Sequence, residues 1–118
     1  MNKLFDSERK IMEVLWEEGD LPASKIAAIL KERVGWNRNT TYTVIGKCID
    51  KGAVSRTDPK FICHAELSKS EVQKYETQEL IDRMFDGSGY AFLSAFLEGD
   101  GLSREEVQKL RKLIDDME

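Results

Sequence analysis

The chain has 118 residues, of which 41% are hydrophobic and 34% charged, and it carries a net charge of -4. This length suits one compact unit or two small ones and is short for an enzyme with a deep pocket. Two isolated cysteines argue against a disulfide-built fold, and the lack of a long apolar run or a signal-peptide pattern predicts a cytoplasmic protein.

The first third of the chain shows the spacing of two short helices. In the first, apolar residues recur at helical spacing after Asp6 or Ser7, either of which can cap the helix start, and Gly19 ends it. The second has Pro22 in its first turn, where a missing amide proton costs little, and Gly35 ends it. We therefore predict two helices joined by a short connection.

A third helix is predicted from near Asn37 to Gly52, and its two ends differ in chemistry. Its first turns are polar, whereas its later turns carry the apolar stripe Val44, Ile45, Cys48 and Ile49. In a helix-turn-helix, the start of the second helix faces base edges and the rest packs on the domain. Hydroxyls suit phosphates and thymine methyls, asparagine suits adenine, and arginine suits guanine or phosphate. This helix is therefore predicted to contact DNA through Arg38, Asn39, Thr40, Tyr42, Thr43 and Lys47.

A β-hairpin is predicted after Gly52, because two short β-prone runs flank the turn signal Thr57-Asp58-Pro59-Lys60. Three helices and a hairpin within about 65 residues is the order of elements in a winged helix-turn-helix domain, whose wing is the hairpin. Arg56 and Lys60 flank the turn and are predicted to reach DNA phosphates or an adjacent groove. Residues 31 to 60 hold seven basic and three acidic side chains, so basic charge gathers on this stretch despite the acidic total.

The last 50 residues show three narrow amphipathic helices. Ser68 with Glu71 and Ser103 with Glu106 have the spacing of capping boxes, and a short apolar helix lies between the two helices that they open. So few residues make a thin core, which predicts that the apolar faces pack against a second copy of the chain. The predicted dimer residues are Val72, Leu80, Met84, Phe92, Phe96, Val107, Leu110 and Ile114.

The predicted fold is mainly α with a small β-hairpin. A winged-helix DNA-binding domain is expected over residues 1–66 and a helical dimerisation domain over residues 67–118. The sequence shows no catalytic constellation and no Gly-rich phosphate loop, so we predict no enzymatic activity, no cofactor and no metal. Trp16 and Trp36 are predicted to pack in the core, Trp36 by fixing the entry angle of the third helix.

Two other readings of the chain remain open on the residues alone. One is a winged-helix adaptor that binds proteins and not DNA, which the net acidic charge would suit. A steep fall of DNA affinity with salt favours a DNA-binding protein over this adaptor. The other is a thiol or metal sensor built on Cys48, Cys63 and His64, although the spacing of these residues fits no known ligand pattern and nothing indicates an activated thiol.

Three stretches resemble the penicillinase-repressor family of bacterial transcription regulators. They are ERKIMEVLWEEGDLPASKIAAIL, WNRNTTYTVIGKCIDKGAVSR, and FDGS followed by AFL and LSREEVQKLRKLI. The resemblance implies a homodimeric repressor that binds palindromic, double-stranded operator DNA upstream of antibiotic-resistance genes. It carries the family's DNA contacts onto Asn39, Thr40, Tyr42, Thr43, Lys47 and Arg56. Tyr42 stands where the best-known members have an arginine and Asn39 where they have a lysine, so the operator sequence is expected to differ.

The resemblance also bears on release from DNA. Family members that respond to beta-lactams are cleaved at an Asn-Phe bond in the middle C-terminal helix, and a membrane metallopeptidase sensor is the implied partner. The corresponding bond here is Ala95-Phe96, which a protease that requires asparagine would not cut. The chain also lacks the cysteine-rich C-terminal motif of the copper-responsive relatives. The inducing signal is left open by the sequence.

Overall fold

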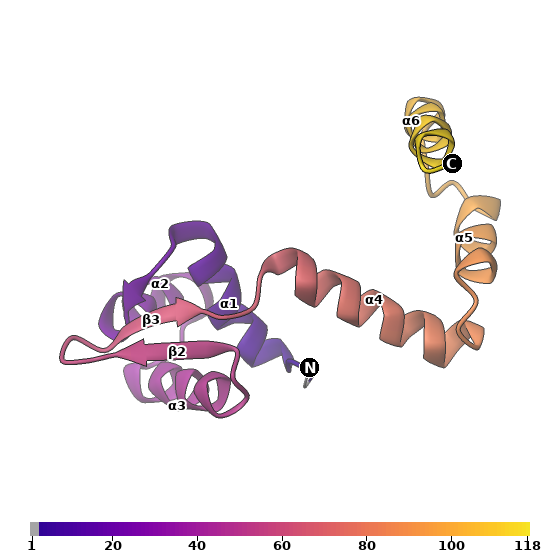
Figure 1. Ribbon diagram of the computed structural model, residues 1–118. Coiled ribbons are helices and arrows are strands. Elements are labelled where there is room, and N and C mark those ends of the chain that lie inside the picture. The colour runs from indigo at the N-terminus through magenta and orange to yellow at the C-terminus, as the bar shows by residue number, and fades with distance from the viewer. Residues whose placement is uncertain (1–2) are drawn as a thin grey trace. The chain divides into compact units, whose positions relative to one another are not determined.

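The computed structural model describes residues 3–118 (Figure 1). In chain order the elements are α1 (Asp6–Glu18), β1 (Leu21–Pro22), α2 (Ala23–Val34), α3 (Arg38–Asp50), β2 (Val54–Thr57), β3 (Ile62–Ala65), α4 (Lys69–Phe85), α5 (Gly89–Glu98) and α6 (Arg104–Asp116). The chain divides into two compact units, unit 1 up to Glu76 and unit 2 over Thr77–Glu118. The boundary lies within α4, and the predicted division at residues 66 and 67 stays a prediction.

The sheet of unit 1 has three strands, in the order β1-β3-β2, and both pairings are antiparallel. The predicted hairpin is therefore present, but the sequence did not reveal β1, which places Leu21 opposite Cys63 and Pro22 opposite Ile62. Pro22 was expected in the first turn of the second helix and instead ends this strand. A two-residue strand is too short to show periodicity, and an edge position tolerates a residue without an amide proton.

The starts of the helices show which capping predictions hold. The Asn37 side chain accepts a hydrogen bond from Thr40 N at 2.8 Å, which confirms the start of α3. Both predicted capping boxes are present, at Ser68 with Glu71 and at Ser103 with Glu106. The prediction for α1 was wrong, because Phe5 occupies the cap position and its backbone amide donates to the Glu8 carboxylate at 2.7 Å.

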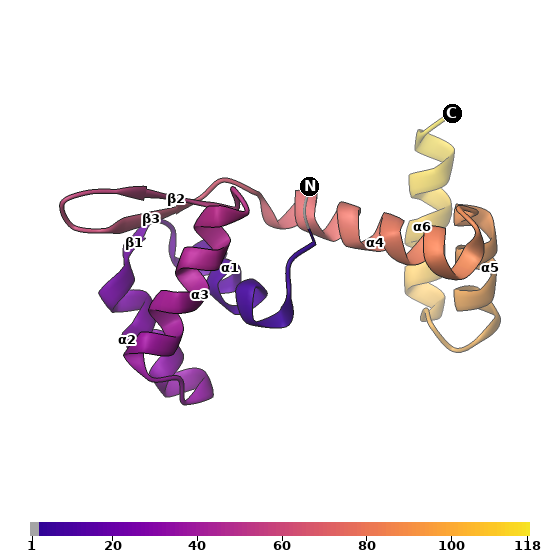
Figure 2. The ribbon, with the colours of Figure 1, turned by 90° about the horizontal axis from the view of Figure 1, so that it is seen from below.

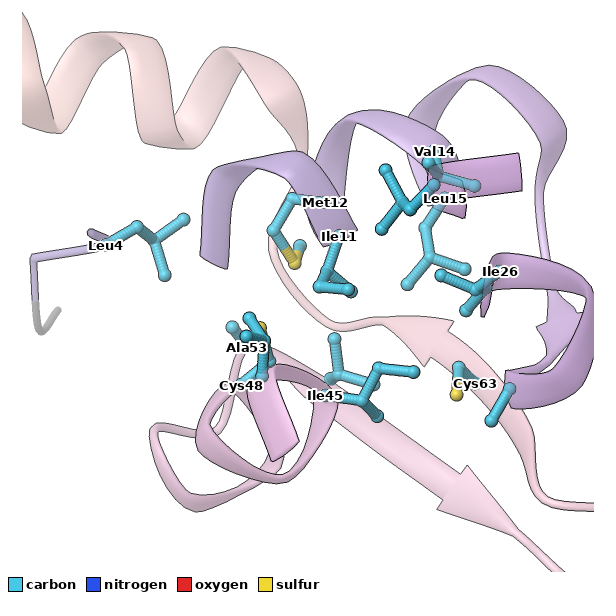
Figure 3. Close-up of a cluster of buried hydrophobic side chains, with 14 of the residues drawn as sticks. Leu4, Ile11, Met12, Val14, Leu15, Ile26, Ile45, Cys48, Ala53 and Cys63 are labelled. Carbon is cyan, nitrogen blue, oxygen red and sulfur yellow. The ribbon is translucent and has the colours of Figure 1, made fainter. Parts of the chain in front are cut away.

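The hydrophobic core of unit 1 lies between the helices and the sheet (Figure 3). α1, α2 and α3 supply most of its side chains. Strands β2 and β3 lie on one side of these helices (Figure 2). Trp16 and Trp36 are half-buried against this core, which confirms that they pack there. The core consists of Leu4, Ile11, Met12, Val14, Leu15, Ala23, Ile26, Leu30, Val44, Ile45, Cys48, Ala53, Val54, Cys63 and Val72.

The first turns of α4 belong to unit 1. Val72 is only 3% exposed and joins the core. The Trp16 indole N–H donates to the Leu67 carbonyl at 2.9 Å, and Arg9 of α1 forms an ion pair with Glu76 of α4. Val72 was predicted at the dimer surface, but these contacts bury it within its own chain. Helical spacing on α4 identifies an apolar position without saying which partner covers it.

Unit 2 is built differently. Phe85 meets Phe92 edge-on with ring centroids 5.6 Å apart, and Phe92 stacks on Phe96 at 6.5 Å. Gly101 lies so close to Phe96 that a Cβ there would come within 2.8 Å of the Phe96 carbonyl oxygen. Among the described residues of α5 and α6, none is buried. Unit 2 therefore has little core of its own.

Candidate nucleic-acid interface

α3 separates its polar and apolar residues as the sequence predicted. The apolar part packs inward, since Val44, Ile45 and Cys48 are buried. Thr41 is also fully buried, so it belongs to the packed side of the helix. The helix leaves five of the six predicted contact residues exposed at the surface: Arg38, Asn39, Thr40, Thr43 and Lys47. An exposed polar start on a well-anchored helix is the arrangement that suits a groove of DNA.

The sixth predicted residue of α3, Tyr42, is half-buried and holds two contacts. Arg38 lies over its ring, 5.0 Å from the centroid, and donates a hydrogen bond from Nη2 to the Tyr42 hydroxyl at 3.0 Å. The Tyr42 ring also meets Phe61 edge-on, with centroids 5.6 Å apart. Tyr42 therefore contacts the turn of the hairpin and is also partly exposed at the surface.

The hairpin presents its two predicted basic residues at the surface. Arg56 lies on β2, and its Nε donates to the Asp58 carboxylate at 2.8 Å. The same guanidinium lies over the Phe61 ring, 3.6 Å from the centroid. Lys60 is exposed in the turn. Sequence reasoning missed Phe61, although an aromatic residue directly after a polar turn is an unusual choice that could have drawn notice.

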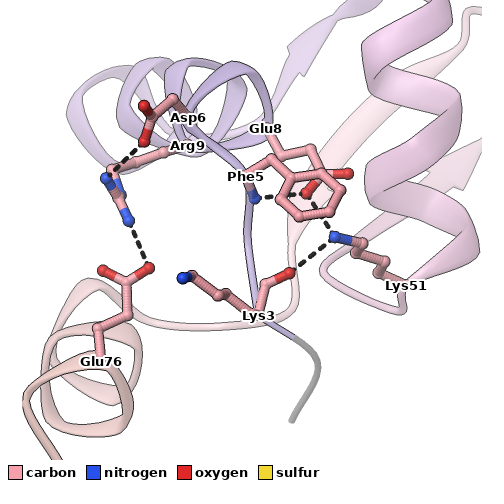
Figure 4. A network of polar contacts seen from close by, with 7 residues as sticks. All are labelled: Lys3, Phe5, Asp6, Glu8, Arg9, Lys51 and Glu76. Atoms are coloured by element: carbon pink, nitrogen blue, oxygen red, sulfur yellow. Dashed lines mark hydrogen bonds and ion pairs between the residues drawn. The ribbon is translucent and has the colours of Figure 1, made fainter. Parts of the chain in front are cut away.

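Two lysines at the far end of α3 have different surroundings. Lys47, a predicted DNA contact, is exposed. Lys51 is instead held inside unit 1, where Nζ lies 2.6 Å from the Glu8 carboxylate and 2.7 Å from the Lys3 carbonyl (Figure 4). Its ammonium group also lies 4.0 Å from the centroid of the Phe5 ring. Lys51 therefore neutralises a buried carboxylate and fastens the N-terminal segment to α3.

The cysteines do not resemble a sensor site. Both thiols are buried, and burial raises the pKa of Cys48 to about 12 and that of Cys63 to about 11. Thiolates are the reactive and metal-binding form, so these environments disfavour both roles. His64 pairs with the Asp20 carboxylate at 2.7 Å. Residues 3–118 hold no cluster of three or more His, Cys, Asp or Glu side chains with metal-ligand geometry.

The profile of the penicillinase repressor family matches residues 4–116. The chain belongs to the penicillinase repressor family. This family consists of DNA-binding transcriptional repressors and not of enzymes, which agrees with the prediction from the sequence. Membership favours the DNA-binding reading over the protein-binding adaptor. Within the described part of the chain, we also find no helix with the length and apolarity of a membrane span.

Individual relatives match along almost the whole chain. The penicillinase repressor of Bacillus licheniformis is 22% identical over 116 residues, which cover 97% of this chain and 91% of the relative. The methicillin resistance regulatory protein MecI of Staphylococcus aureus strain N315 is 25% identical over 118 residues, with 96% of each chain covered. An uncharacterised 16.5 kDa protein of Latilactobacillus sakei is 23% identical, over 96% of this chain and 79% of its own.

The fold has a counterpart among solved structures. The solution structure of the DNA-binding domain of the repressor BlaI matches with a TM-score of 0.54 and 22% identity. The match covers 60% of this chain and 93% of that domain. This likeness confirms a mainly helical fold with an N-terminal winged helix-turn-helix, followed here by further helices.

Proposed function

We propose that the protein is a homodimeric repressor that binds palindromic operator DNA in the cytoplasm. Each copy places the start of α3 in a major groove, and the hairpin reaches the neighbouring phosphates. The observation that carries this proposal is the exposed polar start of α3 on a helix whose later turns are buried. Occupied promoter DNA would exclude RNA polymerase. Half-sites about 34 Å apart, or a multiple of that distance, would suit a two-fold symmetric dimer.

The proposed DNA contacts are those that the sequence suggested. Asn39, Thr40, Tyr42 and Thr43 would contact bases and nearby phosphates, as their donors, acceptors and methyl groups allow. Arg38, Lys47, Arg56 and Lys60 would contact chiefly phosphates. Lys51 is left out, because Glu8 and the Lys3 carbonyl occupy its ammonium group.

Unit 2 is the proposed dimer surface. A groove of about 440 Å³ runs between α5 and α6, and Leu93, Leu97 and Ile114 line it together with Tyr90, Ser94 and Glu98. Leu80, Met84, Phe96 and Ile114 are between 37% and 63% exposed, which is unusual for large apolar residues that cluster on one unit. Phe92, Val107 and Leu110 are half-buried beside them. A second copy of the same helices would cover this surface symmetrically.

The regulated genes are proposed from the relatives. Two of them are named for penicillinase repression and for regulation of methicillin resistance, so antibiotic- or stress-resistance genes are the proposed targets. A membrane metallopeptidase sensor is a proposed partner only if it accepts the Ala95-Phe96 bond. The bond lies within α5 and carries alanine in place of asparagine, so a protease that requires asparagine would not cut it.

The proposed DNA contacts of α3 can be tested directly. Duplexes selected by the protein from a random pool supply an operator, and affinity is measured by mobility shift at fixed salt. Thr40→Ala, Thr43→Ala and Lys47→Ala combined should weaken binding at least about 100-fold, since each good contact contributes about 1–3 kcal/mol. Lys74→Ala with Thr77→Ala changes similar exposed residues of α4 and serves as the control. Unchanged operator affinity in the triple variant would refute the assignment of α3.

A further inference from the structure

Phe61, in the turn of the hairpin, contacts three elements of unit 1. Its ring meets Tyr42 of α3 at an interplanar angle of 86°. The guanidinium of Arg56, on β2, covers the same ring at 3.6 Å. Its backbone carbonyl accepts a hydrogen bond at 3.0 Å from the amide of Ala23, the first residue of α2. Phe61 therefore contacts α3, β2 and α2.

The backbone of Phe61 is held in a conformation that its residue type disfavours. Its φ is 51°, in the left-handed region, which costs a residue with a Cβ about 1–2 kcal/mol. Glycine or asparagine would occupy this position at lower cost. The ring contacts with Tyr42 and Arg56 offset that cost, because edge-on aromatic pairs and stacked guanidinium groups are both favourable. The contacts of the ring, and not the backbone conformation, therefore explain why phenylalanine occupies this position.

The ring restricts Arg56 on one side while Asp58 restricts it on the other. Because Nε donates to the Asp58 carboxylate, the terminal Nη groups are the donors left for a phosphate. A long arginine side chain that is already ordered loses less conformational entropy when it binds. The Phe61 ring would thus lower the entropic cost of an Arg56–phosphate contact.

We propose that Phe61, packed against Tyr42 of α3, is a positioning residue that holds Arg56 of the hairpin for binding a DNA phosphate. This inference rests on the proposed DNA-binding role of α3 and the hairpin. Phe61 itself need not touch DNA. Its removal would act on affinity through Arg56, so the effects of changing the two residues should not be independent.

A double-mutant cycle with the full-length protein tests this dependence. Operator affinity is measured by fluorescence anisotropy between 50 and 200 mM salt for Arg56→Gln, Phe61→Leu and the double variant. Each single variant should bind about tenfold more weakly, and its slope of log affinity against log salt should fall by about one phosphate contact. The double variant should bind no more weakly than Arg56→Gln alone. Phe61→Tyr keeps the ring and should restore the wild-type slope.

Phe5→Leu is the matched control, because it also removes a ring from beneath a cation, that of Lys51, away from the proposed interface. It should leave the salt slope unchanged. Circular dichroism confirms folding of each variant, and Phe61→Met replaces Phe61→Leu if the latter does not fold. Additive losses in the cycle, or a full salt slope in Phe61→Leu, would overturn the role of Phe61. No effect of Arg56→Gln would instead refute the Arg56 contact within the proposed function.

Discussion

The two units of this protein are both built largely from amphipathic helices, with opposite results. In unit 1, three helices and a sheet pack around a common core, so side chains such as Ile11, Ile26 and Ile45 are fully buried. In unit 2, α5 and α6 leave Leu113, Ile114 and others at the surface. The comparison shows that a helical apolar stripe specifies a surface to be covered and does not identify what covers it.

The largest expected effect is a loss of operator affinity when the apolar surface of unit 2 can no longer pair with a second copy. Ile114→Glu places a charge in the groove between α5 and α6 and should dissociate the proposed dimer. Linked binding of two half-sites is then lost, so operator affinity should fall about 10²- to 10⁴-fold. Analytical ultracentrifugation and mobility shift measure the two effects.

Gln108→Glu introduces the same residue at an exposed polar position of α6 and is the control for this change. It should remain dimeric and bind the operator normally. If wild-type protein sediments as a monomer at micromolar concentration, unit 2 is not a dimer surface and the contrast between the units needs another explanation.

The next largest effect concerns the stability of unit 1. Lys51→Met leaves the carboxylate of Glu8, which is 1% exposed, without its cation. Removing one partner of a buried ion pair should lower the free energy of unfolding of unit 1 by on the order of 3 kcal/mol. Urea denaturation followed by circular dichroism measures the change. Lys47→Met alters an exposed lysine of the same helix and should stay within about 0.5 kcal/mol of wild type.

A smaller effect of opposite sign is expected at Thr41. Its Oγ1 is buried, and residues 3–118 supply no hydrogen-bond partner for it. Thr41→Val replaces the hydroxyl with a methyl group of similar size and should stabilise unit 1 by about 1 kcal/mol. Thermal unfolding detects the gain, and Thr40→Val, at an exposed neighbour, should show none of it. A loss of stability in Thr41→Val would mean that the hydroxyl is satisfied in solution.

The smallest expected effect is on the pH dependence of stability and comes from an ion pair on the surface of unit 1. A hydrogen bond to the Asp20 carboxylate raises the pKa of His64 above its usual value. The pair therefore stabilises the fold at pH below about 6.5, the pKa of an unfolded histidine, and the contribution disappears as pH rises through the folded pKa. His64 is the only histidine, so its NMR titration is unambiguous. Asp20→Asn should lower the measured pKa, and an unchanged value would show that the pair does not form.

Local patterns in the sequence predicted the local structure well. Helical spacing and capping residues such as Ser68 and Ser103 located the helices, because the groups that satisfy one another lie within four residues. The predicted exposure of the start of α3 follows from the same pattern. The assignment of individual residues to base or phosphate contacts stays a prediction.

Features that depend on contacts between residues far apart in the chain could not be predicted from the sequence. β1 exists because Leu21 pairs with Cys63, and Lys51 is withdrawn from the surface because Glu8 lies beside it. Val72 is covered by unit 1, although its spacing matched the residues that remain exposed further along α4. In each case, residue type and spacing indicated that a partner was needed, and the tertiary structure selected which one.

Trp16 also makes the protein suitable for optical work. Its indole N–H donates to the carbonyl of Leu67, two residues before α4, and the chain contains two tryptophans in all. In a Trp36→Phe variant, Trp16 would be the sole indole emitter, and hydration of its ring would shift the emission to longer wavelength. The fluorescence spectrum of that variant would therefore report whether the first turns of α4 stay docked on α1, without an attached dye, in dilute solution or in the presence of DNA.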